Sequence, residues 1–529
     1  MTVRRRSLLK FSPALALPAP ALGQDMRART LRLVPSTDLV SLDPVVSTAL
    51  VAVQHGYHVF DTLYGVDGQM RAQPQMAEGH QVSDDGLTWT IRLREGLRFH
   101  DGEPVRSRDC AASLERWSRR DTFGRVYAAA VDAYETPDDR TLRIRLKRPF
   151  PRLAEAIGKP HSAPAFIMPE RIVRASPDAP ITEIIGSGPY RFLRSEWSSG
   201  NLIAYGRFDG YVPRSEAPEW TSGGKVAHFE RVEWRVIADK STAVSALVQG
   251  EVDWMESIPP DLEPVAIRSR RVRIESADPL GSVVVMRFNH LAPPFNNAAL
   301  RRYVMQVARQ TDYLATVSGG NASAWRECRA MFPCAIPGVE EIGREQFGAL
   351  AAGGPAMAEA LRATGYNGEK VVILNPADNA TLAPLGPVTA NLLRRAGLNV
   401  ELLDMDWGTL LQRRNNRLGV ERGGWSIFHT TWPSIAIANP VLNTTIRGEG
   451  ATGWPGWFES AEMERLTGTW LSATDAAEQA RLHAEIHALA LREVPTLPLG
   501  IHFPRTAYRN ELTGVLGGSV RYPWNVRRA

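Results

Sequence analysis

The strongest constraint on the fold is a strand–helix–strand pattern in the second half of the chain. Residues 371–374 are an apolar run typical of a buried strand, residues 387–396 have helical periodicity, and residues 398–403 have the pattern of a second strand. Strands joined by a crossover helix pair in parallel. This pattern therefore predicts a parallel α/β unit, and the alternation of strands and helices along the rest of the chain indicates the α/β class throughout.

The length and charge of the chain limit its organisation. At 529 residues it exceeds what one hydrophobic core supports, so we expect at least two lobes. The formal charge of +5 is concentrated at the N-terminus, where residues 1–23 hold four basic residues and no acid. Without them the balance of 62 basic and 57 acidic residues becomes 58 to 57. Such a near-neutral chain is not expected to bind nucleic acid.

Residues 1–23 have the pattern of an export signal. A basic start is followed by a short apolar stretch and by Ala21-Leu22-Gly23, a small-x-small cleavage site. The segment RRSLLK at 5–10 resembles a twin-arginine signal, and prolines within the apolar stretch disfavour a helix of the fold itself. We therefore expect a periplasmic protein. We also expect no lipid anchor, because no cysteine follows the cleavage site, and a soluble mature chain, because no later run approaches the ~20 apolar residues of a membrane span.

Three cysteines remain to be assigned. Cys328 and Cys334 lie six residues apart in a loop-like stretch, and in an oxidising compartment we expect them to form a disulfide. A metal pair is the alternative, although no histidine or second cysteine pair lies nearby. Cys110 falls on a predicted helix and is interpreted as a small buried apolar residue.

Residues 83–117 combine several local signals. An Asp-Asp-Gly turn leads into strict alternation over residues 87–94, and residues 97–100 are predicted to return as the partner strand of a β-hairpin. Beyond Pro104 the period becomes helical, with Cys110, Leu114 and Trp117 on one face.

Together with other short motifs, this stretch carries a family resemblance. The motifs are LDP at 42–44, FDTL at 60–63, PQMAE at 74–78, GSGPY at 186–190, ALVQGEVD at 246–253, PFNNAALR at 294–301, PTLPL at 495–499 and AYR at 507–509. In this order they resemble family 5 of the extracytoplasmic solute-binding proteins, which serve dipeptide, oligopeptide and nickel ABC importers. The resemblance runs from about residue 30 to the C-terminus.

This resemblance implies a two-lobed periplasmic-binding-protein type II fold with an extra subdomain in lobe I, termed cluster C. Lobe I is expected over 30–280 with its subdomain at about 61–184, lobe II over 281–493, and a return to lobe I over 494–529. The implied function is capture of a small solute, peptide-like or another organic molecule, between the lobes and its delivery to the membrane permease subunits of an ABC importer. A monomer without catalytic activity, cofactor or metal is expected.

A tryptophan-rich region indicates where a ligand would bind. Five of the fourteen tryptophans fall between residues 407 and 457. Aromatic walls with a few polar groups suit a small-ligand cleft, although packing in the core is the alternative for each ring. The candidate ligand-binding residues here are Trp407, Trp425, His429, Thr430, Trp432 and Asn439.

One departure from the family pattern bears on the ligand. In peptide-binding members the residue three positions after the tryptophan equivalent to Trp425 is an aspartate that pairs with the ligand's amino group; here it is Phe428. An enclosed ammonium group without a counter-charge is costly. Ordinary peptide recognition is therefore in question unless another acid substitutes. Arg413 and Arg414 are candidates for a carboxylate or sulfonate, with a solvated helix face as the alternative.

A second candidate segment lies near the N-terminus. In this family it borders the cleft, so His55 and Tyr57 are candidate ligand contacts. His55 and His58 share a helical face, yet no cluster of cysteines or carboxylates accompanies them, and no metal site is expected. The alternative from another class is a secreted hydrolase with its active site in the cleft, but the sequence shows no Gly-x-Ser-x-Gly or His-Glu-x-x-His motif.

Overall fold

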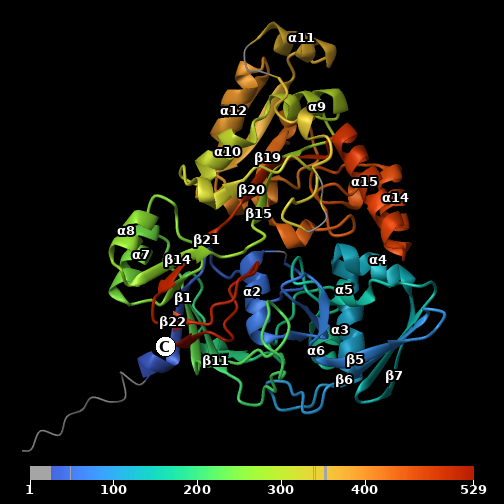
Figure 1. Cartoon of the computed structure of the whole chain (residues 1–529), viewed down its shortest axis with the longest axis vertical. Helices are drawn as coiled ribbons and strands as arrows, with labels where there is room; N and C mark the ends of the chain where they lie inside the picture. Colours follow the sequence, from blue (N-terminus) through green and yellow to red (C-terminus); the bar gives the residue numbers. More distant parts are fainter. Residues whose placement is uncertain (1–25, 48, 337–338, 340, 351–353) are drawn as a thin grey trace, which may run out of the picture.

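The computed structural model describes residues 26–47, 49–336, 339, 341–350 and 354–529, which form two α/β lobes, drawn one above the other in Figure 1. The predicted export signal, residues 1–23, lies outside the described residues. Over the described ranges, no helix has the length and apolar character needed to cross a membrane.

Lobe I, the lower lobe in Figure 1, is built on a seven-stranded sheet. In spatial order its strands are β10 (Tyr190–Phe192), β11 (Leu202–Arg207), β12 (Arg231–Arg235), β1 (Thr30–Val34), β13 (Trp254–Met255), β21 (Arg505–Arg509) and β14 (Val272–Ser276). The strand β1 pairs in parallel with β12 and β13, and the other pairs are antiparallel. Helix α2 (Leu50–Val59) packs against β10, and α7 (Lys240–Gln249) and α8 (Glu263–Arg268) pack against the β13–β14 end.

The subdomain of lobe I contains a separate antiparallel sheet in the order β5 (Ala77–Val82), β6 (Thr88–Leu93), β8 (Thr141–Leu146), β7 (Val131–Asp138). The predicted hairpin is wrong: β6 pairs with β5 and β8, whereas Arg98 makes only an isolated bridge to Pro104. Both edges of β6 are occupied by strands from elsewhere, so no edge remains for residues 97–100. The predicted helix is present as α3 (Ser107–Arg120), with Cys110, Leu114 and Trp117 fully buried.

Lobe II is built on a six-stranded sheet with the order β16 (Trp325–Arg326), β20 (Thr496–His502), β15 (Ser282–Phe288), β19 (Ile427–Pro433), β17 (Lys370–Pro376), β18 (Asn399–Met405). The predicted parallel unit is confirmed, because β17 and β18 pair in parallel and are joined by α12 (Leu385–Arg395). With α9 (Ala298–Val307) and α10 (Gln310–Val317), α12 covers one face of this sheet. The other face packs against residues of α13 (Trp407–Arg413) and of the segments 328–335 and 425–457.

The remaining elements complete the two lobes. The other helices are α4 (Thr122–Ala130), α5 (Leu153–Gly158), α6 (Glu170–Ala175), α11 (Pro355–Ala363), α13 (Trp407–Arg413), α14 (Ala461–Ser472) and α15 (Ala476–Glu493). Three short antiparallel ribbons pair β2 (Asp61–Thr62) with β9 (Phe166–Ile167), β3 (Tyr64–Val66) with β4 (Ala72–Pro74), and β22 (Leu512–Thr513) with β23 (Arg527–Arg528).

Two chain crossings join the lobes. One crossing leads from β14 to β15 and the other from β20 to β21. A hydrogen bond links the two crossings, because the Ala277 amide donates to the Pro504 carbonyl at 2.8 Å. The return to lobe I predicted at residue 494 therefore comes later, after His502. The reason is that β20 is buried along its whole length between β15 and β16, and so belongs to the sheet of lobe II.

Candidate ligand site between the lobes

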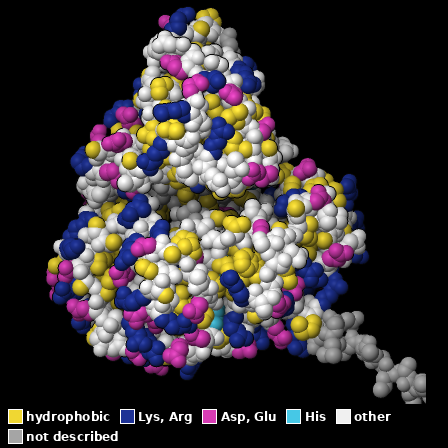
Figure 2. Space-filling model, turned by 180° about the vertical axis from the view of Figure 1, so that it is seen from behind, with side chains coloured by type: hydrophobic (Ala, Val, Ile, Leu, Met, Phe, Trp, Pro, Cys, Tyr) yellow, Lys and Arg dark blue, Asp and Glu magenta, His cyan; other side chains and the backbone are white. Residues whose placement is uncertain are grey.

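A cavity of about 220 Å³ lies between the lobes, and its lining comes from both of them. Lobe I contributes the start of α4 and residues of the loop 159–162. Lobe II contributes the end of β19 and parts of the segment 436–454. Viewed from behind, the molecular surface is hollowed between the upper and lower lobes (Figure 2). The site is therefore completed only when both lobes are in place.

The lobe I wall is fixed by a buried ion pair. Asp121 begins α4 by accepting a hydrogen bond from the Gly124 amide at 2.8 Å, which satisfies a free donor of the first turn. Its other carboxylate oxygen lies 2.7 Å from Lys159 Nζ, and both side chains are almost fully buried. Burial lowers the pKa of Lys159, and the carboxylate of Asp121 opposes that change. The positive charge of Lys159 is thus matched within lobe I.

The loop that carries Lys159 has an unusual backbone. Ser162 and Ala163 have φ angles of 57° and 51°, a left-handed conformation that costs non-glycine residues about 1–2 kcal/mol each. Bonds from three side chains hold it: Lys159 Nζ donates to the carbonyls of His161 and Ser162, Trp117 Nε1 to Ala163, and Tyr57 Oη to Pro160. These bonds fix the wall of the cavity.

An ion pair spans the two lobes beside the cavity. The guanidinium of Arg125, on α4, lies 3.5 Å from the carboxylate of Glu449 in lobe II. Glu449 also lies 3.2 Å from Arg447, which in turn pairs with Glu464 at 2.5 Å. The two carboxylates lining the cavity, Asp121 and Glu449, therefore both have cationic partners.

Arg414, in contrast, lines the cavity without a counter-charge. No carboxylate of the described residues lies within ion-pair distance of it, and its Nε atom is buried without a hydrogen-bond partner. Its Cζ lies 5.8 Å from the centroid of the Phe428 ring. Burial lowers the pKa of Arg414 to about 10, so the group remains charged at neutral pH. The indole Nε1 of Trp432, which also lines the cavity, is likewise buried and unpartnered.

The predicted residues in β19 and just before it lie in different surroundings. Trp432 lines the cavity. Trp425 is 1% exposed, donates from Nε1 to the Arg414 carbonyl at 2.9 Å, and packs behind Phe428 with a ring separation of 5.0 Å. His429 is fully buried on the opposite face of the sheet, where Nε2 lies 2.8 Å from Thr389 Oγ1. Thr430 lies in the strand opposite Val285 and is not part of the cavity lining.

The other predicted contacts also lie outside the lining. Trp407 begins α13 and packs, half-buried, in the cluster behind β17. The Asn439 side chain accepts from the amides of Val441 and Leu442, two residues that do line the cavity. His55 is buried in lobe I beside Tyr205, at 2.9 Å. Asn439 and Tyr57 therefore support the walls of the cavity indirectly.

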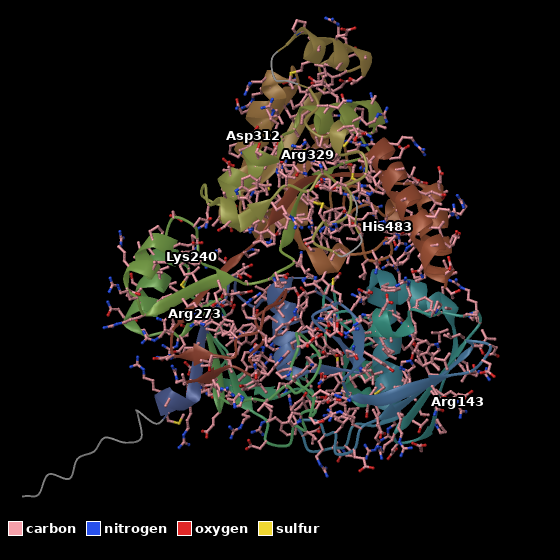
Figure 3. All side chains as sticks on the ribbon, in the orientation of Figure 1. Arg143, Lys240, Arg273, Asp312, Arg329 and His483 are labelled. Atoms are coloured by element: carbon pink, nitrogen blue, oxygen red, sulfur yellow. A yellow bond between two sulfur atoms is a disulfide. The ribbon has the colours of Figure 1, made fainter. Side chains whose placement is uncertain are left out.

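Histidines elsewhere are accounted for by packing. On α15, where Figure 3 labels His483, the ring of His483 lies 4.2 Å from Phe332, and His487 Nε2 accepts from the Met331 amide at 3.0 Å. His487 is fully buried. Within the described part of the chain, no group of three or more His, Cys, Asp or Glu side chains is placed to hold a metal ion.

Several cavity residues were not selected from the sequence. Asp121 and Arg125 lie together at the start of α4, but Lys159 and Glu449 lie in two other segments, and no local motif connects the three. Arg414 was predicted from the sequence, because it and Arg413 were named as candidates for binding a carboxylate or sulfonate. Its neighbour Arg413 donates from Nε to the Gly423 carbonyl at 3.2 Å and lies outside the lining.

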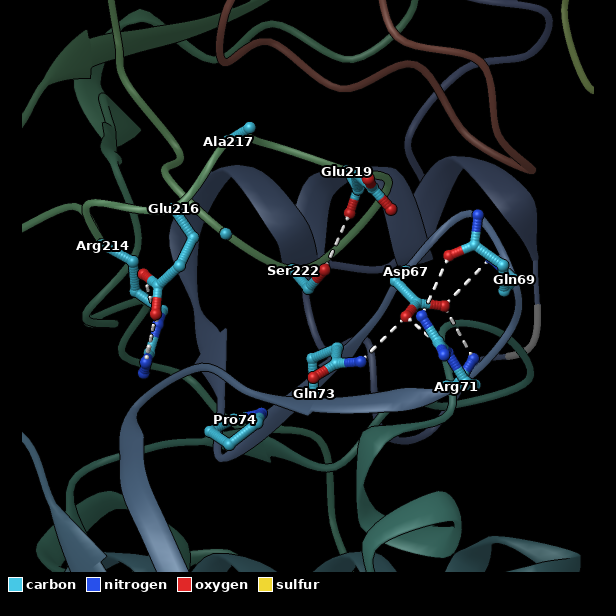
Figure 4. Close-up of a pocket in the computed structure, with 11 residues that line it drawn as sticks. Asp67, Gln69, Arg71, Gln73, Pro74, Arg214, Glu216, Ala217, Glu219 and Ser222 are labelled. Atoms are coloured by element: carbon cyan, nitrogen blue, oxygen red, sulfur yellow. Dashed lines mark hydrogen bonds and ion pairs between the residues drawn. The ribbon is translucent and has the colours of Figure 1, made fainter.

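A second pocket, of about 280 Å³, lies within lobe I, away from the interlobe cavity (Figure 4). Most of its charged groups are paired with one another: Asp67 accepts from Arg71 and Gln73 at 3.0 and 2.8 Å, and Arg214 donates to Glu216 at 2.8 Å. The carboxylate of Glu219, which is exposed, accepts from the Gly68 amide at 3.0 Å. The one lining charge without a counter-charge, Glu219, is thus solvated and hydrogen-bonded, so the interlobe cavity is the stronger ligand site.

Two lobes joined by two crossings, with a partly charged cavity between them, define a solute-binding protein. Residues 71–445 match the family of bacterial extracellular solute-binding proteins, family 5. The chain belongs to this family. It is therefore a substrate-binding protein and not an enzyme, which leaves the hydrolase alternative without support.

Individual relatives extend over the whole chain. A probable peptide ABC transporter periplasmic-binding protein of Sinorhizobium fredii is 34% identical over 100% of both chains. The glutathione-binding protein GsiB of Salmonella typhi is 24% identical over 94% of this chain and 92% of its own. Among solved structures, the Helicobacter pylori protein DppA, in complex with the peptide STSA, has a TM-score of 0.77 at 20% identity, covering 96% of this chain and 99% of its own. The last comparison shows the shared fold.

Proposed function

We propose that this protein is an exported receptor that encloses a peptide-like solute between its lobes and delivers it to the permease of an ABC importer. The observation that carries the proposal is the cavity of about 220 Å³, lined by both lobes and bordered by the interlobe pair Arg125–Glu449. A ligand bound there contacts both lobes at once, so its binding favours the closed arrangement over an open one.

We also propose that the receptor is exported to the periplasm. The Sinorhizobium fredii relative is named as a periplasmic-binding protein of a peptide ABC transporter, which supports a periplasmic location. Together with the glutathione-binding relative of Salmonella typhi, it supports a small peptide-like ligand. The twin-arginine-like start of the sequence supports export. The pairing of Cys328 with Cys334 as a disulfide fits that oxidising compartment.

The test is binding without turnover. A fraction of di- and tripeptides from hydrolysed casein should raise the melting temperature of the protein, and the rise should grow with peptide concentration. At a ligand concentration of 100 times Kd, the unfolding free energy should increase by about 2.7 kcal/mol. Quenching or enhancement of tryptophan fluorescence should accompany it, because Trp432 and Trp454 line the cavity. Mass spectrometry should recover the bound peptides unchanged. Chemical conversion of the peptides, or the absence of any stabilisation, would contradict the proposal.

A further inference from the structure

We infer that the interlobe cavity selects ligands that carry a carboxylate, and that Arg414 and Trp432 bind this carboxylate. The inference deepens and rests on the proposed receptor function, since it names the chemical class of the ligand. It follows from the balance of charges and hydrogen-bond donors in the cavity.

The charged groups of the cavity leave one positive charge unmatched. Lys159 is neutralised by Asp121 and Arg125 by Glu449, whereas no carboxylate lies near Arg414 among the described residues. An enclosed cation without a partner is unfavourable, and a ligand anion removes that cost. An ammonium group on the ligand, by contrast, meets two carboxylates that already have partners.

Two buried arginines, Arg287 and Arg301, differ from Arg414, which is partly buried. Arg287, fully buried in lobe II, has no carboxylate partner either, but its guanidinium donates to the carbonyls of Thr445 and Pro495 at 2.7 and 3.0 Å and to two further carbonyls. Arg301 is satisfied in the same manner by carbonyls of residues 295, 493 and 494. The fold thus supplies acceptors to these two arginines, whereas no acceptor among the described residues reaches Nε of Arg414.

The two unpartnered groups of the cavity are both donors. Arg414 Nε and Trp432 Nε1 are buried without acceptors. A carboxylate accepts hydrogen bonds through two oxygens and donates none, so it satisfies both groups and the charge together. The rings of Trp432 and Trp454, 5.6 Å apart, form an apolar wall for the rest of the ligand. A neutral amide could satisfy a donor but would leave the charge of Arg414 unmatched.

The experiment compares three forms of one casein-derived di- and tripeptide fraction: untreated, N-acetylated, and carboxyl-amidated. The wild-type protein should bind the untreated and N-acetylated fractions with similar apparent Kd, and the amidated fraction about 10- to 100-fold more weakly. Arg414→Gln should weaken binding of the N-acetylated fraction by about 10- to 100-fold, and Trp432→Phe, which keeps a ring but removes the donor, by about 2- to 10-fold.

Arg413→Gln is the matched control, because Arg413 is the adjacent residue and the last of α13 but donates to Gly423 outside the cavity. The affinity of this variant should stay within about twofold of that of the wild type. Circular dichroism and melting temperature establish that each variant is folded. Equal binding of the amidated fraction, or unchanged affinity of folded Arg414→Gln, would overturn the carboxylate inference and leave the receptor function standing. Failure of all three fractions to bind wild type would overturn the peptide-receptor proposal, and the inference with it.

Discussion

The guanidinium of Arg125 and the carboxylate of Glu449 lie 3.5 Å apart, although the first belongs to the subdomain of lobe I and the second to lobe II. A second contact lies on the same side of the molecule, where Arg152 donates to Gln479 Oε1 at 2.7 Å and stacks over the Trp470 ring at 4.2 Å. In Figure 1 the lower end of α14, which carries Trp470, lies next to α4 and α5. The lobes are thus held together on the subdomain side of the cavity.

We predict that Arg125→Gln weakens closure of the lobes to a small extent. The Arg125 side chain is 44% exposed, so the pair contributes about 0.2–1 kcal/mol, and the Kd for ligand should rise by no more than about fivefold. Isothermal titration with the peptide fraction measures the change. Arg119→Gln is the control, because its pair with Glu115 lies within α3. An equal effect of both substitutions would contradict a role of Arg125 in closure.

A larger effect is expected from Asp121→Asn. This substitution leaves the buried ammonium of Lys159 without its carboxylate, which costs about 3–5 kcal/mol of stability. The double variant Asp121→Asn/Lys159→Met removes both charges and should recover part of that loss. Urea unfolding measures all three proteins. If the double variant proved no more stable than the single one, the unpaired charge would not be the cause.

The buried histidines of α2 predict a loss of stability in acid. Burial lowers the pKa of His58 to about 3, while in the unfolded chain it is near 6.5. The unfolded state therefore binds a proton below pH 6.5 that the folded state refuses until about pH 3. Above pH 6.5 neither state binds this proton, so His58 does not lower the unfolding free energy. As the pH drops from 6.5 toward 3, the unfolding free energy falls by about 1 kcal/mol per pH unit because of His58.

His58→Gln should consequently reduce the dependence of the unfolding free energy on pH between 6 and 4. Urea unfolding at several pH values measures this slope. His228, which is exposed, provides the control: His228→Gln should change the slope much less. Identical slopes for wild type and His58→Gln would show that His58 does not titrate in this way.

Cys328 and Cys334 are joined in the structure, and Cys110 is a buried free thiol. Protein unfolded without reductant should therefore react with one equivalent of thiol reagent per chain, and reduced protein with three. Cys328→Ser/Cys334→Ser should lower stability by only about 2 kcal/mol, because the closed loop is short. Three reactive thiols in unreduced periplasmic protein would refute the pairing.

Trp425 is expected to act on stability rather than by touching ligand. It is 1% exposed and packs against Phe428 and Trp457, so Trp425→Ala should cost about 3–5 kcal/mol. Its Nε1 also bonds the Arg414 carbonyl, so Trp425→Phe, which keeps most of the packing, isolates that bond. Differential scanning calorimetry and titration of ligand measure the two effects. Weakened binding by Trp425→Ala without a loss of stability would instead place Trp425 at the ligand.

Parts of the fold followed from local pattern. The β17–α12–β18 unit and the helix α3 were predictable because a period of 3.6 or an apolar run reports burial within one element. The partners of β6 and the sheet that holds β20 were not, because an apolar strand has the same pattern whichever neighbour it pairs with. Of the predicted ligand contacts, Trp432 lines the cavity, while His429, on the opposite face of the same strand, does not.

The sequence by itself determined the family, the α/β class and the enrichment of tryptophan in lobe II, since these depend on residue order and composition along the chain. Only the tertiary structure decided which charges meet. Asp121 reaches Lys159 and Arg125 reaches Glu449, whereas Arg414 meets no acid and its neighbour Arg413 turns to the Gly423 carbonyl. The physical reason is that desolvation and ion pairing depend on distances between elements far apart in sequence, and these are fixed only when the lobes pack.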